Sequence, residues 1–471
     1  MSNPPSRAAA LALAAMTAAC TDWANLGGVD PGATGGGGGS GGSEQSRCGL
    51  SQAAFCEEFE LPHPGGRGGE LDESIFGFAR WGHQVQYSWE RAPAHTYGDD
   101  YLFPATFCGV AFDGVLPDQD VRTCDGVGVD GTVSGQLNET FDDQGATGVN
   151  ALRIRQPFDF AGRIGKVAWD VDAKINPLNS GQGWWMAVWL SSEPTPLASD
   201  GRDAITSYPQ HGVGFTFAFG ADCPEDVNDW QNALEGVVVT DDYQVTSARP
   251  FWELDQADAR CFKVADAHMN HFELRLSEDE AELWASDIDD PATLSLRTKT
   301  SGLGLSFSRG YVQLQHWASN AASGGVTPTQ TFRWDNVGFD GPVLPTPRAY
   351  EVPDPGTPGQ SGAVRIGYLL AEGPFSFTLP GVDLSNATSA SFNFVLDGGP
   401  GDELAYALNG NPPHTFVYPG TDGSPGGIHG FSAEVPLSEL VPGDNVLSVS
   451  LPAALVAQGI GSLDLTLEVA K

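Results

Sequence analysis

Apolar and polar residues alternate through many segments between residues 48 and 342. Residues 166–175 (KVAWDVDAKI) alternate aromatic or aliphatic side chains with charged ones, and residues 311–317 (YVQLQHW) place two amides opposite two aliphatic side chains. Alternate side chains on a β-strand point to opposite faces, so each segment predicts a strand with one buried face. Many such strands in succession predict an all-β fold, a two-sheet antiparallel jelly-roll sandwich.

The segment GQGWWMAVWLSS contains three tryptophans, which the alternation divides between two faces. Trp184 is in phase with bulky apolar residues, and we expect it in the core. Trp185 and Trp189 are in phase with small residues such as Ala187, and we expect them on the opposite face.

That opposite face carries side chains suited to carbohydrate, if this strand and YVQLQHW lie side by side. Aromatic planes cover the apolar faces of sugar rings, and amides bond to sugar hydroxyls. The candidate carbohydrate-binding residues are Trp185, Trp189, Tyr311, Gln313, Gln315 and Trp317. A plain solvated face is the alternative interpretation of the two glutamines.

Changes in composition divide the chain. A Gly/Ser-rich stretch follows a short apolar run near the start, and a proline-rich stretch lies beyond the alternating region. We expect a signal peptide at 1–20, a disordered tether at 21–47, the jelly roll at 48–342, a linker at 343–362 and a smaller C-terminal β-sandwich at 363–471.

The first residues indicate export. The apolar run AAALALAAMTAA is too short to span a bilayer and is typical of a secretory signal. It ends in TAAC, which resembles the lipobox of bacterial lipoproteins, although Thr17 stands where leucine is usual. The resemblance implies lipidation of Cys20, membrane contact through a lipid anchor only, and a place at the bacterial outer membrane or cell surface. An ordinary secretory signal is the alternative.

The net charge limits the possible partners, and the cysteine content predicts disulfides. The chain has 60 acidic and 23 basic residues, a net charge of -37, which argues against nucleic-acid binding. Of seven cysteines, setting Cys20 aside leaves six, an even number suited to disulfides in an exported protein. Pairing across short loops gives the candidate disulfides Cys48–Cys56, Cys108–Cys124 and Cys223–Cys261, although other connectivities stay open.

Four segments, in this order, resemble strands of the concanavalin A-like lectin/glucanase jelly roll, and especially laminarinase-type glycoside hydrolases. They are FCEEFE, GWWMAVWLSS, HFELRLSEDEAELWASDID and TFRWDNVGFDG, the last of which usually pairs with the first. The resemblance implies a concave sheet that holds polysaccharide. It also implies a structural calcium ion near the first and last strands, with Asp335 and Glu57 or Glu58 as ligands. Turn hydrogen bonds are the alternative role of Asp335, and no other cofactor is expected.

The C-terminal segment resembles a galactose-binding-like β-sandwich, a carbohydrate-binding accessory module. The resemblance is carried by AYALNGNPP and by the turn at residues 442–445 in VPGDNVLSVS. These turn residues also occur in other β-sandwiches.

Laminarinase-type hydrolases carry E-x-D-x-E on the strand after the tryptophan strand, because hydrolysis with retention needs two carboxylates on one face. The next predicted strand here is GVGFTFAFG, which has Gly214, Thr216 and Ala218 on that face. We therefore expect the hydrolase chemistry to be absent.

Other charged pairs leave an enzyme as an alternative. Asp170 and Asp172 share a strand face, where they could act as a displaced dyad or form charge pairs with Arg153 and Arg155 across a hairpin. The side chains available as a lyase base, in no recognisable motif, are Tyr311, His268, His271 and His316.

The leading hypothesis is non-catalytic binding of a polysaccharide or glycoconjugate by an exported, tethered lipoprotein. One alternative is a glycoside hydrolase or polysaccharide lyase with relocated catalytic residues. The other is a structural or adhesive surface protein.

Overall fold

A computed structural model describes the main part of the chain. The described residues are 47–58, 74–82, 106–107, 110–111, 121–124, 134–140, 146–174, 182–192, 212–219, 230–239, 249–250, 261–263, 270–287, 290–320, 329–352, 368–369, 374–419, 427–450 and 459–470. They contain β-strands and two short 3₁₀ helices, η3 (Arg47–Gly49) and η9 (Leu437–Glu439), but no α-helix. The all-β prediction is confirmed. Within these ranges, no helix has the length and apolar character needed to cross a membrane.

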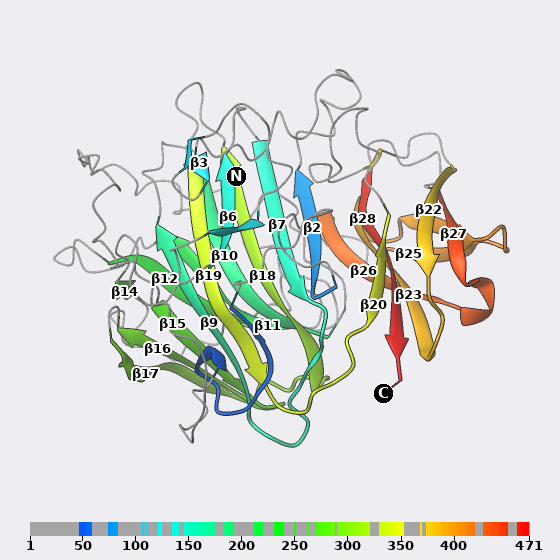
Figure 1. Ribbon diagram of the computed structural model, residues 1–471. Helices are drawn as coiled ribbons and strands as arrows, with labels where there is room; N and C mark the ends of the chain where they lie inside the picture. Colours follow the sequence, from blue (N-terminus) through cyan, green and yellow to red (C-terminus); the bar gives the residue numbers. More distant parts are fainter. Residues whose placement is uncertain are drawn as a thin grey trace, which may run out of the picture.

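The first domain consists of two antiparallel sheets (Figure 1). Sheet A runs in the order β17 (Asp290–Ser301), β16 (Glu280–Asp287), β15 (Asn270–Leu276), β9 (Gly165–Lys174), β19 (Thr329–Asp340), β6 (Ser134–Thr140) and β5 (Val121–Cys124), with β1 (Ala53–Glu57) beside β19. Sheet B runs in the order β13 (Arg249–Pro250), β12 (Trp230–Val239), β11 (Gly212–Phe219), β10 (Gln182–Ser191), β18 (Arg309–Asn320), β7 (Ala146–Ile154) and β2 (Phe76–Gly82), with β14 (Cys261–Lys263) beside β12 and β8 (Phe158–Asp159) beside β18. A separate pair is formed by β3 (Thr106–Phe107) and β4 (Val110–Ala111).

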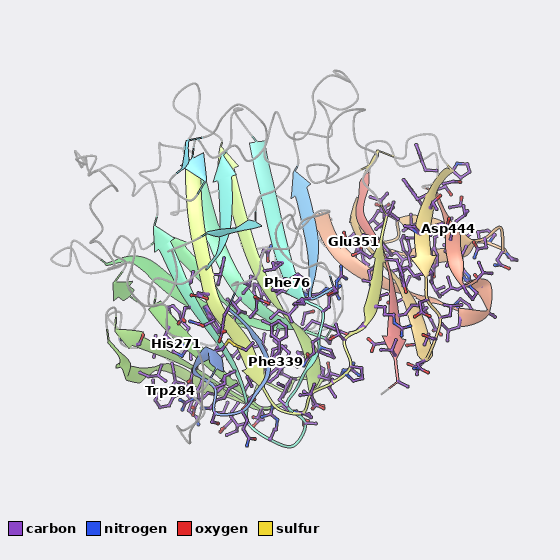
Figure 2. All side chains as sticks on the ribbon, in the orientation of Figure 1. Phe76, His271, Trp284, Phe339, Glu351 and Asp444 are labelled. Atoms are coloured by element: carbon purple, nitrogen blue, oxygen red, sulfur yellow. A yellow bond between two sulfur atoms is a disulfide. The ribbon has the colours of Figure 1, made fainter. Side chains whose placement is uncertain are left out.

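An aromatic cluster joins the inner faces of sheets A and B. Phe339 of β19 stacks on Phe55 of β1 with ring centroids 5.3 Å apart, and Phe55 meets Phe76 of β2 edge-on at 6.5 Å. Phe158 lies 5.4 Å from Phe339. Because Phe339 belongs to sheet A and Phe76 to sheet B, the core lies between the two sheets (Figure 2).

Two strand pairings agree with those predicted from the sequence. The closing strand β19 pairs with β1, and Phe55 faces Phe339 in the register. The hairpin of β15 and β16 turns at residues 277–280, where the Ser277 amide donates to the Glu280 carbonyl at 2.8 Å. The hairpin follows from alternation that ends in a short polar turn, whereas the pairing of β1 with β19 was expected from the family resemblance.

The expected charge pairs across a hairpin are not formed. Arg153 and Arg155 do not face Asp170 and Asp172 across a hairpin, because β7 lies in sheet B and β9 lies in sheet A. The chain crosses from one sheet to the other between these strands. Alternation reveals the face of a strand, but it does not reveal the sheet to which the strand belongs.

The C-terminal domain is a second antiparallel sandwich, as predicted. Its sheet C contains β20 (Arg348–Glu351), β28 (Gly459–Val469), β23 (Ala387–Gly398) and β26 (Gly427–Val435), with β21 (Tyr368–Leu369) beside β28. Its sheet D contains β22 (Phe375–Val382), β27 (Gly443–Ser450), β24 (Glu403–Leu408) and β25 (His414–Val417). The residues buried between them form one continuous apolar core.

Two asparagine turns close sheet D. The Asn409 side chain donates to Asn445 Oδ1 at 2.7 Å, and Asn445 Nδ2 donates to the carbonyls of Val441 and Gly443. Asn409 has a φ of 53°, a conformation that asparagine tolerates better than most residues. The LNG and PGDN turns noted in the sequence are therefore joined by hydrogen bonds.

Residues 348–351, which the sequence places in the linker, instead form β20 and pair with β28. The proline-rich character of residues 343–362 does not extend through the segment RAYE, which offers its backbone to the edge of sheet C. As a result, the second domain begins before residue 363.

Candidate functional site

The candidate residues lie on what we call the outer face of sheet B, the face directed away from sheet A. Strands β10 and β18 are neighbours, and their register pairs Trp189 with Gln313 and Trp185 with Trp317. Ala187 pairs with Gln315 in the same register. The expectation that the two strands lie side by side is confirmed.

The neighbouring strand β11 brings small residues to this face. Trp189 pairs with Gly214, and Trp185 pairs with Ala218. No register position of β11 beside the tryptophans holds a carboxylate. On the following strand, Glu235 is the register partner of Thr216. Because β12 was not among the strands predicted from the pattern, the sequence did not point to this position.

Trp189 is held in place by two neighbours. A Cβ added at Gly214 would collide with the Trp189 ring and with the Val188 carbonyl, so the indole lies directly over the glycine. The indole N–H donates to Gln315 Oε1 at 2.9 Å. The glycine gives the ring space, and the amide fixes its edge.

The candidate residues with described side chains are buried. Trp189, Gln313 and Gln315 are 0% exposed and Tyr311 is 6% exposed. Gln313 and Gln315 therefore do not form the open polar surface that the sequence suggested, and the Gln315 oxygen accepts a hydrogen bond from an indole. The side chains of Trp185 and Trp317 lie outside the described part of the structure.

Two buried arginines complete the outer face of sheet B. Arg153 of β7 pairs in register with Gln313, and the next residue on the same face is Arg155. Both are almost fully buried, at 1% and 2% exposure. A Cβ at Gly77 would lie 2.9 Å from Arg153 Nη2, so glycine gives the guanidinium space. Alternation located this face, but the arginines were assigned to structural charge pairs.

Burial, together with the nearby charge of Arg155, lowers the pKa of Arg153 to about 10. Arg153 is therefore still protonated at neutral pH. Its guanidinium carbon lies 5.5 Å from the centre of the Tyr311 ring, within cation–π range. The outer face of sheet B thus carries a buried positive charge next to an aromatic ring.

The C-terminal domain contacts one end of this face (Figure 1). Arg155 Nη2 forms an ion pair with Glu351 of β20 at 2.9 Å, and the Tyr311 hydroxyl donates to Glu468 of β28 at 3.0 Å. Arg309 pairs with Glu468 at 3.2 Å. The two domains therefore meet through charged groups at the end of β18.

Tyr311 does not have the properties of a lyase base. Burial and the charge of Glu468 raise the pKa of Tyr311 above its usual value, so the phenol stays protonated. His271 lies in sheet A, on the other side of the sandwich from Tyr311. His268 and the side chain of His316 lie outside the described part of the structure. The two bases with described side chains are therefore not brought together.

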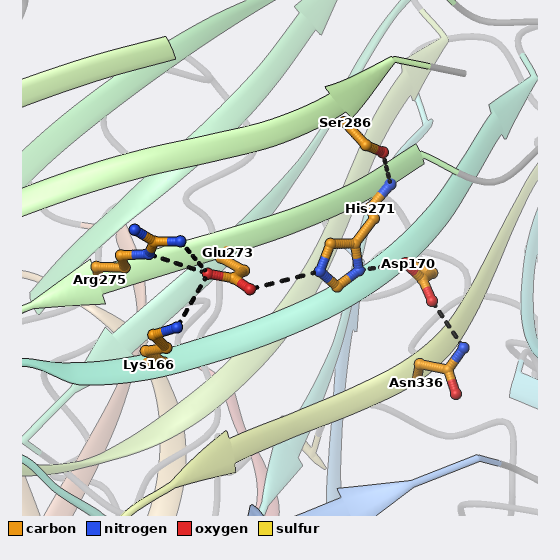
Figure 3. Close-up of polar contacts among 7 residues, drawn as sticks. All are labelled: Lys166, Asp170, His271, Glu273, Arg275, Ser286 and Asn336. Atoms are coloured by element: carbon orange, nitrogen blue, oxygen red, sulfur yellow. Dashed lines mark hydrogen bonds and ion pairs between the residues drawn. The ribbon is translucent and has the colours of Figure 1, made fainter. Parts of the chain in front are cut away.

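A second polar cluster occupies the outer face of sheet A (Figure 3). His271 Nδ1 lies 2.7 Å from Asp170 Oδ1, and its Nε2 lies 3.9 Å from Glu273 Oε1. Asn336 Nδ2 donates to Asp170 Oδ2 at 2.7 Å, and Arg275 pairs with Glu273 at 2.8 Å. The carboxylates are thus used in a charge network, not in a pair of acids set up for catalysis.

The charges of this cluster support one another. Burial alone would lower the pKa of His271, but its pairing with Asp170 and Glu273 raises it to about 9. Burial alone would raise the pKa of Glu273, but its pairing with His271 and Arg275 lowers it to about 2. At neutral pH the imidazolium therefore lies between two carboxylates.

Two of the predicted calcium ligands, Asp335 and Glu57, lie on the neighbouring strands β19 and β1. Asp335 is buried in the bulge of β19, and Glu57 pairs with Val337 on the neighbouring strand β1. Asp335 Oδ1 accepts from the Asn336 amide at 2.8 Å, which is the turn role weighed as the alternative. Among the described residues, no group of His, Cys, Asp or Glu side chains could hold a metal ion.

One disulfide is confirmed, between Cys48 and Cys56. The other pairings involve two cysteines outside the described residues, Cys108 and Cys223, and two whose side chains are not described, Cys124 and Cys261. The lipidation candidate Cys20, with the predicted signal and most of the tether, also lies outside the described residues.

Comparison with known proteins gives structural likeness only. No family model and no curated protein sequence matches the chain. The LamAcat structure from Zobellia galactanivorans matches with a TM-score of 0.30 and 12% identity over 61% of this chain and 97% of that one. Lectin II from Ulex europaeus matches with a TM-score of 0.26 and 12% identity over 44% and 86%.

The VIP36 exoplasmic/lumenal domain, in a form bound to Ca²⁺ and mannose, matches with a TM-score of 0.26 and 13% identity over 51% of this chain and 91% of that one. The matched proteins include lectins with β-sandwich folds. At these scores and identities, substrate and activity must be derived from the residues of the chain itself.

Proposed function

We propose that the chain is an exported protein that binds a polysaccharide or glycoconjugate on the outer face of sheet B without cleaving it. The observation that carries the proposal is the register of β10 and β18, which sets Trp185 beside Trp317 and Trp189 beside Gln313. Aromatic planes next to amides are the side chains that sugar rings and hydroxyls need. Trp189, fixed by Gln315, would serve as the floor of such a site.

The proposal excludes hydrolysis of the laminarinase type. Small residues of β11 occupy the positions beside the tryptophans, where a pair of acids would be needed. Anchoring through a lipid on Cys20 belongs to the same proposal, and mass spectrometry of the mature N-terminus tests it. The galactose-binding-like character of the C-terminal sandwich and the calcium ion remain predictions.

A second candidate is a structural or adhesive surface protein. It is favoured by the burial of Trp189, Gln313 and Gln315, which leaves these three side chains no exposed surface. In that case the outer face of sheet B would be a second packed layer, and no sugar would reach it.

A glycan array, followed by affinity measurement on each hit, separates the two candidates. The variants are Trp185→Ala, Trp317→Ala and Trp189→Phe, the last of which keeps an aromatic ring but loses the indole N–H. We expect each alanine variant to weaken binding about tenfold or more, because stacking on one aromatic ring is lost. Trp284→Ala, on the outer face of sheet A, is the matched control and should bind as the wild type does. Unchanged binding in all three variants would contradict the site, and no binding to any glycan would favour the adhesive function.

A further inference from the structure

The unpaired polar atoms on the outer face of sheet B are all hydrogen-bond donors. Arg153 Nε, Arg153 Nη2 and Gln315 Nε2 are buried and have no hydrogen-bond partner among the described residues. Arg153 is 1% exposed and Gln315 is 0% exposed. A buried donor without an acceptor is costly, and the cost is greater for a charged group. The two side chains thus require acceptor atoms.

The direction of the Gln315 amide follows from its partner. An indole N–H can only donate, so the Gln315 atom that lies 2.9 Å from Trp189 Nε1 must be the oxygen. The amide nitrogen is therefore turned away from the indole. Trp189 satisfies the Gln315 oxygen, and the amide nitrogen is the atom of Gln315 that has no hydrogen-bond partner.

Arg153 keeps its positive charge, since even its lowered pKa of about 10 lies well above neutral pH. Glu351 forms an ion pair with Arg155 at 2.9 Å, and the charges of Asp464 and Glu351 partly offset the effect of burial on the pKa of Arg153. A guanidinium buried in this way is suited to a further anion.

The two donors lie near each other on one face. Arg153 is the register partner of Gln313, and Gln315 is the next residue of β18 on that face. Diagonal neighbours of this kind have Cα atoms about 7–8 Å apart, within reach of long side chains. A carboxylate or sulfate accepts hydrogen bonds only, whereas a sugar hydroxyl also has a hydrogen to place. The unsatisfied donors of Arg153 and Gln315 therefore match an acid better than a neutral sugar.

We propose that the outer face of sheet B binds an anionic sugar residue, whose carboxylate or sulfate accepts hydrogen bonds from Arg153 and Gln315. This inference rests on the proposed function and names the chemical class of its ligand. Because both side chains are buried, binding includes a step that opens a path to them, and association is slow compared with that at an exposed site.

The test uses polymers that differ only in charge. Affinities are measured for a panel of uronate polymers (polygalacturonate and alginate among them), for each polymer after reduction of its carboxylates to alcohols, and for dextran sulfate beside dextran. The buffer has physiological ionic strength, which screens the net charge of -37 beyond about 8 Å and affects buried contacts less.

The variants are Arg153→Gln and Gln315→Glu. Glutamate keeps an acceptor for the Trp189 indole, so Gln315→Glu retains that bond while it replaces a donor with a repelling charge. We expect each variant to weaken binding of the acidic polymer about tenfold to hundredfold, which is the range for a hydrogen bond to a charged group. Lys299→Gln, on the outer face of sheet A, removes one positive charge elsewhere and should leave affinity unchanged.

The outcomes are distinct. Preference for an acidic polymer over its neutral form, lost in both variants, supports the inference, and the panel shows whether the acid is a carboxylate or a sulfate. Equal binding of the charged and neutral forms, or full binding by Gln315→Glu, overturns the inference and leaves the proposed function intact. The absence of binding to every polymer and every arrayed glycan overturns both.

Discussion

His271 should stabilise the first domain at neutral pH, and this stabilisation should be lost as the pH becomes alkaline. Its imidazole is 16% exposed, lies 2.7 Å from Asp170 and packs against Gly49, whose added Cβ would lie 3.0 Å from the ring. The perturbation is His271→Gln, which can still bond to Asp170 but carries no charge. The charged groups that surround the ring are Asp170 and Glu273, with Lys166 and Arg275 on the far side of Glu273.

The size of the effect follows from the raised pKa. The pKa of His271 rises from 6.5 to about 9 on folding, so the folded protein holds this proton more tightly than the unfolded chain. A difference of this size contributes about 3 kcal/mol to stability, at about 1.4 kcal/mol per pKa unit. Because the folded pKa is the higher one, the contribution is fully present below pH 6.5 and is lost as the pH rises through about 9.

The assay is urea unfolding of wild type and His271→Gln between about pH 6 and about pH 10, with the difference in free energy of unfolding taken at each pH. Taking the difference cancels the other groups that titrate in this range. We expect the free energy of unfolding of the wild type to exceed that of the variant by about 3 kcal/mol at the acid end, and this difference to fall to about 0.1 kcal/mol or less at the alkaline end. A difference that stays constant across the range would refute the reasoning, because it would mean that the folded imidazole is not charged.

Three further predictions concern other contacts. Glu351→Gln should destabilise the domain junction by about 3–5 kcal/mol, because Arg155 would keep its buried charge and lose its ion-pair partner, and proteolysis between the domains should become faster. Gly214→Ala should cost about 1–3 kcal/mol through overcrowding, and should shift tryptophan fluorescence as Trp189 is displaced; unchanged fluorescence would contradict the packing. Asn445→Ala should lower the melting temperature of the C-terminal sandwich, with about 1 kcal/mol lost for each of its hydrogen bonds, whereas Asp444→Ala in the same turn should have a smaller effect.

Alternation and turn chemistry predicted the parts of the fold that depend on local sequence. The β15–β16 hairpin and the disulfide between Cys48 and Cys56 are both short-range features. The pairing of β1 with β19 joins distant segments, and it was expected only from the family resemblance.

The remaining features depend on contacts that a single strand does not encode. Arg155 directly follows β7, whose pattern is the same whether the partner of Arg155 is Asp172 or Glu351, and only the assignment of strands to sheets decides between them. Gln313 and Gln315 lie on a polar face, and alternation does not distinguish a face open to water from one that is covered. From the sequence, RAYE is predicted to be part of a proline-rich linker, because nothing in the segment itself indicates that it pairs with the edge of β28.

The Cys48–Cys56 loop packs on the outer face of sheet A. Cys48 and Leu50 pack on Ala168, which shares the outer face of sheet A with Asp170, while the candidate binding face belongs to sheet B on the other side of the sandwich. Residues 47–50 therefore lie on the side of the first domain opposite to the candidate binding face. Under the proposed anchoring through Cys20, the disulfide loop would transmit any pull on the anchor to sheet A and not to the outer face of sheet B.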